Sequence, residues 1–263
     1  MGVFYKIRRS TRSAIRTLIL FSTALQGCAV YSLRRLRGRL SKQERVRWLH
    51  GCCSNALRRL RIEIETQGAF PSRGLLVANH LSYLDILVLS ALSPCAFVAK
   101  KEVRSWPLFG LMAQMSGTVF VDRSRSSDAH RANSEMTEAL AEGIVVVLFP
   151  EGTSSDGSSV LPFRPALFEA AVSSGEYVSS AHISYALDQG SVASDICYWG
   201  EMTFFPHLVK LLSKSKVVAR VNFAADVRKF EDRKQAAQMT REAVESLAQM
   251  NSRGQSYREA GVR

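Results

Sequence analysis

GLLVANHLSYLD, residues 74–85, joins a small aliphatic run to a polar segment that holds a histidine and an aspartate five residues apart. The aliphatic run, Gly74 to Ala78, is bounded by glycine and is typical of a buried parallel strand. An apolar stretch from Ile86 to Leu92 follows, and its length suits a helix packed on that strand. Open α/β sheets place their sites at the carboxyl ends of such strands. The segment therefore predicts both a fold class and a candidate site.

His80 and Asp85 have two interpretations. Histidine is well suited to take up a proton near neutral pH, and a nearby carboxylate fixes its tautomer and stabilises the imidazolium. Alternatively, Ser82-x-x-Asp85 is a capping box, in which Asp85 only satisfies helix amides and His80 is a hydrogen-bonded loop residue. The segment alone leaves both interpretations open.

Strand-like and helix-like stretches alternate along the remainder of the chain, without an internal repeat. This pattern predicts an α/β fold with a mostly parallel central sheet flanked by helices, preceded by an N-terminal membrane-associating helical segment. Strands are expected at residues 75–78, 96–99, 117–121, 144–149, 178–185 and 217–223, and helices at residues 83–92, 107–115, 128–142, 164–174 and 233–249. We divide the chain into a basic helical region (1–62), an α/β domain (63–250) and a polar C-terminal tail (251–263).

The positive charge is concentrated at the N-terminus. Residues 1–61 contain 15 Lys or Arg and a single acidic residue, Glu44, whereas the net charge of the whole chain is +12. The uncharged stretch Thr17–Leu33 lies between arginine clusters, which predicts a helix embedded in or lying on an anionic membrane surface. A second amphipathic helix is expected at residues 41–60. The apolar run argues against a nucleic-acid-binding arm.

Export is the alternative interpretation of this N-terminal region, because Leu25 to Cys28 faintly resembles a lipoprotein cleavage site. The preceding basic region is long for a signal peptide, so we expect a membrane-associated protein on the cytoplasmic face of the inner (plasma) membrane. The five cysteines form no C-x-x-C pair and no metal-ligand spacing, which favours free thiols in a reducing compartment.

Polar clusters also follow three other predicted strands. Lys100-Lys101 follows residues 96–99, Asp122-Arg123 follows residues 117–121, and a glycine-containing loop at residues 150–157 follows residues 144–149. The carboxyl ends of parallel strands meet at one sheet edge, so we expect these clusters to converge with His80. A base, fixed cations and free loop amides suit an anionic substrate and an oxyanion formed during group transfer.

Three of these clusters resemble the ordered motifs of the 1-acylglycerol-3-phosphate acyltransferase family of glycerolipid acyltransferases. Asn79-His80-x-x-x-x-Asp85 is similar to its NHX4D motif, GTVFVDR at residues 117–123 to its second motif, and FPEGT at residues 149–153 to its third. The resemblance covers roughly residues 70–185. It implies transfer of a fatty acyl group from acyl-CoA or acyl-carrier protein, as co-substrate, to the free hydroxyl of a lysolipid acceptor. The first expectation is 1-acyl-sn-glycerol-3-phosphate, which gives phosphatidic acid in phospholipid biosynthesis.

The same resemblance implies residue roles and requires no metal and no cofactor. His80 deprotonates the acceptor hydroxyl and Asp85 orients His80. The remaining residues bind substrate. Arg123 holds the phosphate of the acceptor, and one of Lys100 and Lys101, for which we take Lys101, faces phosphate while the other is solvated. Glu151, Gly152 and Thr153 shape the acceptor pocket.

Two positions depart from the family pattern. Ser154 stands where the third motif usually has arginine, and the apolar strand at residues 178–185 lacks the proline usual in the fourth motif. These departures make lyso-ornithine lipid O-acyltransferase a close alternative, because its acceptor has a zwitterionic amino-acid headgroup in place of a phosphomonoester. A non-catalytic lipid-binding protein that kept the fold is a further alternative. His182 is expected to be a packed core histidine.

Overall fold

The computed structural model of the protein describes residues 2–122 and 126–260. Within them, seven strands form one sheet in the order β1-β7-β6-β2-β5-β3-β4. The pairs are parallel except for β6 and β7, which are antiparallel. The strands are β1 (Ile62–Gln67), β2 (Leu75–Ala78), β3 (Cys95–Lys100), β4 (Val119–Val121), β5 (Val145–Leu148), β6 (Val178–Leu187) and β7 (Val217–Arg228). The predicted mostly parallel sheet is confirmed.

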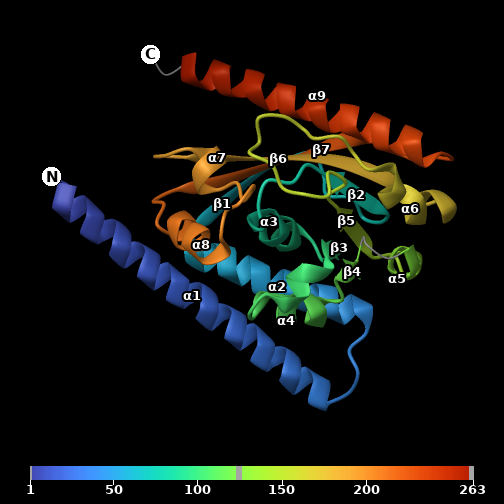
Figure 1. Cartoon of the computed structure of the whole chain (residues 1–263), viewed down its shortest axis with the longest axis horizontal. Coiled ribbons are helices and arrows are strands. Elements are labelled where there is room, and N and C mark those ends of the chain that lie inside the picture. Colours follow the sequence, from blue (N-terminus) through green and yellow to red (C-terminus); the bar gives the residue numbers. More distant parts are fainter. Residues whose placement is uncertain (1, 123–125, 261–263) are drawn as a thin grey trace.

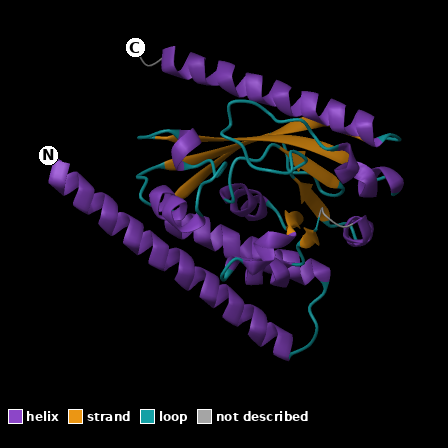
Figure 2. Ribbon diagram, viewed as in Figure 1, coloured by secondary structure: helices purple, strands orange, loops and turns teal. Residues whose placement is uncertain are grey.

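Helices cover both faces of this sheet (Figures 1 and 2). One apolar core lies on the side of α1, α2, α3 and α8, and a second lies on the side of α5, α6 and α9. The helices are α1 (Gly2–Leu36), α2 (Lys42–Leu60), α3 (Leu84–Leu92), α4 (Phe109–Ser116), α5 (Ser126–Ala141), α6 (Glu169–Ser173), α7 (Val192–Asp195), α8 (Phe204–Leu212) and α9 (Arg233–Ala260), with two 3-10 helices, η1 (Lys101–Ser105) and η2 (Pro165–Phe168).

The central strands are the ones whose sequence is most uniformly apolar. Every residue of β2 and β5 is buried. The two strands pair in parallel, with Leu75 opposite Val146 and Val77 opposite Leu148. A strand covered on both faces needs apolar residues at successive positions, which explains why these two strands were recognisable from sequence.

The N-terminal helices are part of the same structure as the sheet. Leu20 and Ala24 of α1 and Leu57 of α2 belong to the core that also contains strand residues. A capping box starts α2: Ser41 Oγ accepts from the Glu44 amide at 3.2 Å and Glu44 Oε2 accepts from the Ser41 amide at 2.8 Å. The outer face of α1 stays exposed, with Leu18 at 71% and Leu25 at 60% of full accessibility.

One strand and two α-helices of the described residues were not predicted from the sequence, and several element boundaries differ. The edge strand β1 carries the exposed glutamate Glu65, so its sequence lacks a continuous apolar run. The short helices α7 and α8 follow β6, and Pro206 inside α8 obscures its helical pattern. At the C-terminus, α9 continues to Ala260 and therefore includes most of the segment that we separated as a polar tail.

Candidate active site

The side chain of Asp85 organises the segment that follows β2. It is fully buried in the first turn of α3. Its Oδ2 accepts hydrogen bonds from His80 Nδ1 at 2.8 Å, from the Leu81 amide at 2.7 Å and from the Ser82 amide at 2.9 Å. Its Oδ1 accepts from the Tyr185 hydroxyl at 2.6 Å. Four donors thus hold one buried carboxylate in a single orientation.

The His80 ring is held by Asp85 and by Phe149 and remains partly accessible. Its Nδ1 faces the Asp85 carboxylate, which assigns the Nδ1–H tautomer and leaves Nε2 able to accept a proton. Its ring stacks on Phe149 with the ring centroids 4.1 Å apart and the planes 15° apart. The side chain keeps 20% of its accessible surface, whereas that of Asp85 keeps none. The pair therefore has the geometry of an accessible base with a buried orienting group.

The capping interpretation is correct for half of the box. Asp85 accepts from the Ser82 amide, as the acidic member of a capping box does. The Ser82 hydroxyl is buried without a hydrogen-bond partner, so the reciprocal bond is missing. The same Asp85 oxygen accepts from both the Ser82 amide and His80, so one carboxylate holds the chain that leads into α3 and orients the histidine.

Asn79 and Tyr185 connect this segment to β6. The Asn79 amide nitrogen donates to the Ile183 carbonyl at 2.9 Å, and its oxygen accepts from the Ile183 amide at 2.7 Å. Tyr185 lies two residues further along β6 and reaches Asp85. Neither contact was predictable from the sequence, because both depend on the register of strands whose contacting residues are 104 and 100 positions apart.

Glu151 is a second residue of the third motif that contacts His80, besides Phe149. Its Oε1 accepts a hydrogen bond from the His80 backbone amide at 3.1 Å. Burial raises the pKa of its carboxyl to about 8, against hydrogen bonds from the His80 and Leu161 amides that lower it. The carboxyl end of β5 is thereby joined to the neighbouring end of β2, as the sequence predicted.

The other predicted substrate-binding residues lie at the same sheet edge but in different environments. Gly152, with φ of 73°, turns the chain after β5, and Thr153 is exposed. Lys101 Nζ pairs with Asp122 Oδ2 at 3.0 Å, which joins the ends of β3 and β4. The hydroxyl of Ser154 donates to the Tyr198 carbonyl. Arg123 lies outside the described residues.

An apolar pocket begins beside the segment that follows β2 and extends toward the N-terminal helices. Tyr83, two residues before Asp85, forms part of its wall, and its hydroxyl lies 2.9 Å from His207 Nδ1 of α8. The other walls come from α1, α2, α3, β3, α4 and α8, with side chains that include Leu20, Ala24, Ala56, Ile86, Phe97 and Phe204. This lining suits a hydrocarbon chain.

Known proteins of similar sequence are acyltransferases. An acyltransferase family model matches residues 61–184. The lyso-ornithine lipid O-acyltransferase of Brucella abortus is 36% identical over 200 residues, which cover 71% of this chain and 75% of the relative. The chain belongs to the acyltransferase family. A second relative, the 1-acyl-sn-glycerol-3-phosphate acyltransferase of Neisseria meningitidis serogroup B, is 37% identical over 62% of this chain and 64% of the relative.

The fold of this acyltransferase is also that of a solved structure. The 1-acyl-sn-glycerophosphate acyltransferase PlsC of Thermotoga maritima matches with a TM-score of 0.64 over 91% of this chain and 98% of that chain, at 21% identity. In the acyltransferase described here, Arg8–Leu36 is long and apolar enough to cross a membrane by length and composition, and most of it is not buried. The helix and the lipid-modifying relatives together point to membrane association.

Proposed function

We propose that this acyltransferase moves a fatty acyl group to the free hydroxyl of a lysolipid, with His80 as the general base. The observation that carries the proposal is the buried Asp85 carboxylate on His80 Nδ1, 2.8 Å away, with the histidine side chain still accessible. A lipid-binding protein without catalysis has no use for a base and its orienting group. The apolar pocket beside the segment supplies a place for a hydrocarbon chain.

The reaction follows from the tautomer. His80 Nε2 takes the proton of the acceptor hydroxyl as the oxygen attacks the carbonyl carbon of an acyl thioester. Asp85 stabilises the resulting imidazolium through Nδ1–H. When the tetrahedral intermediate collapses, the carbon–sulfur bond breaks and the leaving thiolate receives the proton from His80. The donor is a thioester of coenzyme A or of acyl-carrier protein, and no covalent enzyme intermediate is needed.

The charges around the third motif favour a zwitterionic acceptor. Ser154, which replaces the usual arginine, gives its hydroxyl to Tyr198, and Lys101 shares its charge with Asp122. Position 154 therefore has no cation for a phosphomonoester, and the cation of Lys101 is already paired with a carboxylate. Lyso-ornithine lipid is therefore the first acceptor that we propose, in agreement with the Brucella abortus relative, which matches over 75% of its length.

1-Acyl-sn-glycerol-3-phosphate is the second acceptor candidate, and it was the first expectation from sequence. The resemblance of residues 117–123 to the second motif implies that Arg123 binds phosphate, and the Neisseria meningitidis relative is the more identical of the two, at 37%. A planar guanidinium matches the oxygens of a phosphate group.

The enzyme works at a membrane because both proposed acceptors are lipids. The exposed apolar face of α1, with arginines at both ends, suits a helix at the interface of an anionic leaflet. The cytoplasmic leaflet is the one that we propose, a choice supported by the excess of basic residues around the apolar stretch of α1.

The test is a mass-spectrometric assay of the full chain in detergent. Lyso-ornithine lipid and lysophosphatidic acid are offered separately, each with acyl-CoA and with acyl-carrier protein. The wild-type protein is compared with His80→Ala and with the control His130→Ala, whose histidine is exposed on α5. His80→Ala is expected to lose roughly 10²–10⁴-fold in turnover, the usual contribution of a general base, while His130→Ala keeps full activity. Undiminished activity in a folded His80→Ala variant refutes the proposal.

A further inference from the structure

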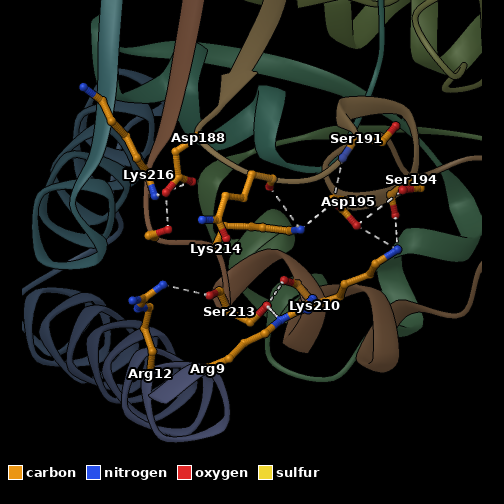
Figure 3. A network of polar contacts seen from close by, with 12 residues as sticks. Arg9, Arg12, Asp188, Ser191, Ser194, Asp195, Lys210, Ser213, Lys214 and Lys216 are labelled. Atoms are coloured by element: carbon orange, nitrogen blue, oxygen red, sulfur yellow. Dashed lines mark hydrogen bonds and ion pairs between the residues drawn. The ribbon is translucent and has the colours of Figure 1, made fainter. Parts of the chain in front are cut away.

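A basic cavity of ≈ 300 Å³ lies between the beginning of α1 and two loops of the α/β body. Arg8, Arg9 and Arg12 line it from α1, residues 188–190 from the loop after β6, and residues 213–215 from the loop after α8. Figure 3 shows the polar contacts around it. No residue that lines this cavity belongs to residues 79–85 or lines the apolar pocket. It is therefore a separate feature of the molecule.

Two of the three guanidinium groups are held in place by the end of α8. Arg9 Nε donates to the Ser213 hydroxyl at 3.0 Å, and Arg12 Nη1 donates to the Ser213 carbonyl at 3.2 Å (Figure 3). Each of these contacts uses one of the five N–H donors that a guanidinium carries. The groups are thus fixed at the cavity wall before any ligand binds, which reduces the entropy lost on binding.

The lysines beside the cavity leave an excess of positive charge. Lys214 is buried and pairs with Asp195, and Lys210 Nζ lies 2.8 Å from the other oxygen of the same carboxylate. Burial raises the pKa of Asp195, but the hydrogen bonds from Lys210 and Lys214 lower it below its ordinary value, so the group stays ionised. One carboxylate therefore pairs with two lysines, which leaves one positive charge in excess.

Asp188 is the carboxylate that lines the cavity itself, and it accepts hydrogen bonds from the Ser215 hydroxyl and, at 3.3 Å, from the Lys216 backbone amide. It is a single negative charge among the three arginines and Lys214 that line the same cavity. The balance of charge therefore favours an anion.

The cavity lies next to the exposed apolar face of α1 along the helix. The exposed apolar face of α1 begins at Ile15 and Leu18, which are 53% and 71% accessible. Arg12 and Ile15 are separated by about 5 Å along the helix, given the rise of about 1.5 Å per residue. When this apolar face contacts the acyl layer of a membrane, the arginines reach the layer of lipid phosphates.

We propose that this cavity binds the phosphate group of one anionic phospholipid of the membrane, in addition to the lysolipid that is acylated. The planar forks of the arginines match phosphate oxygens, and the attached acyl chains extend along the exposed face of α1. The bound lipid fastens α1 to the loop after α8, the helix whose Phe204 lines the apolar pocket. This site goes beyond the proposed acyl transfer and does not depend on which lysolipid is the acceptor.

The experiment counts lipids on the full chain by native mass spectrometry. The protein is released from phosphatidylcholine nanodiscs that contain one fifth phosphatidylglycerol. Arg8→Gln is the informative variant, because Arg8 is an exposed residue of the cavity wall and its replacement leaves the contacts of Arg9 and Arg12 with Ser213 intact. Arg39→Gln is the matched control, since Arg39 is exposed, makes the same change in net charge, and lies outside the cavity lining.

One retained phosphatidylglycerol per wild-type chain is expected. Arg8→Gln is expected to lower its occupancy by about fivefold, the effect of one arginine at an anionic surface, and Arg39→Gln to leave it unchanged. Equal losses in the two variants, or a wild-type chain that retains no phosphatidylglycerol, overturn the proposal. His80→Ala is expected to keep the lipid although it loses acyl transfer, so a failed lipid site and a failed catalytic assignment give different results.

Discussion

Replacing Glu151 by glutamine removes the ionisable group of the third motif and keeps the shape of the side chain. The carboxyl is buried against the backbone of His80, and this burial raises its pKa from an ordinary 4.5 to about 8, opposed by amide hydrogen bonds and assisted by the nearby Asp85. Glutamine has almost the same shape and keeps an oxygen that accepts from the His80 amide. Only the ability to ionise is removed.

The pKa of Glu151 gives the sign and the size of the expected effect. Because the folded state holds the proton more tightly than the unfolded state, the stability that Glu151 contributes is fully present below pH 4.5 and is lost as the pH rises through about 8. For these two pKa values, the free energy of unfolding falls by about 3 kcal/mol between pH 6 and pH 9. Glu151→Gln lacks this contribution to the pH dependence.

The assay is thermal unfolding in a nonionic detergent, followed by intrinsic fluorescence at pH 6 and at pH 9. A loss of about 3 kcal/mol corresponds to a fall in Tm of roughly 6–12 °C for a chain of this size. Other groups titrate in the same range, so the quantity that decides is the difference between the Tm changes of wild type and Glu151→Gln. Equal changes in the two proteins refute the raised pKa and the burial argument behind it.

Two further substitutions test the orienting contact and the apolar pocket. Tyr185→Phe removes the hydroxyl that donates to Asp85 at 2.6 Å. A hydrogen bond to a charged group contributes about 1.5–3 kcal/mol. We therefore expect kcat to fall roughly 10- to 100-fold, with little change in the KM for the lysolipid. Steady-state kinetics with Tyr177→Phe as control measure this, and a loss confined to KM contradicts an orienting role. Ala56→Leu places a larger side chain in the apolar pocket and leaves less room for the acyl chain. Each methylene of the acyl chain that stays buried contributes about 0.8 kcal/mol to binding. The preferred acyl chain is therefore expected to shorten by two or three carbons. Competition within a series of acyl-CoA lengths checks this, and an unchanged preference shows that the acyl chain lies elsewhere.

The parts of the fold that follow from local pattern were predictable. β2 spans residues 75–78 as expected, because a strand buried on both faces must be continuously apolar. The pairing of His80 with Asp85 follows from five residues of chain and the start of one helix. The contact between Glu151 and His80 follows from a single rule, that the ends of parallel strands share an edge of the sheet.

The remaining contacts depend on long-range register and were not predictable. Tyr185 reaches Asp85 only because β6 pairs with β2 so that Ala181 lies opposite Ala78. A shift of one residue would turn the tyrosine to the other face of the sheet. The edge strand β1 escaped prediction for a related reason, since a strand with one exposed face and polar side chains has no distinctive local pattern.

The structure explains why the segment after β2 combines an asparagine, a histidine and an aspartate. Asn79 fixes the end of β2 to Ile183 of β6 through two hydrogen bonds. Asp85 is fixed by two backbone amides of the loop before α3 and by a tyrosine of the same strand β6. The histidine between them is anchored through its backbone, whose amide donates to Glu151. Its ring is oriented by the hydrogen bond between Nδ1 and Asp85 and by stacking on Phe149, and its side chain stays partly accessible. The rigidity of the flanking residues therefore leaves the base both oriented and accessible.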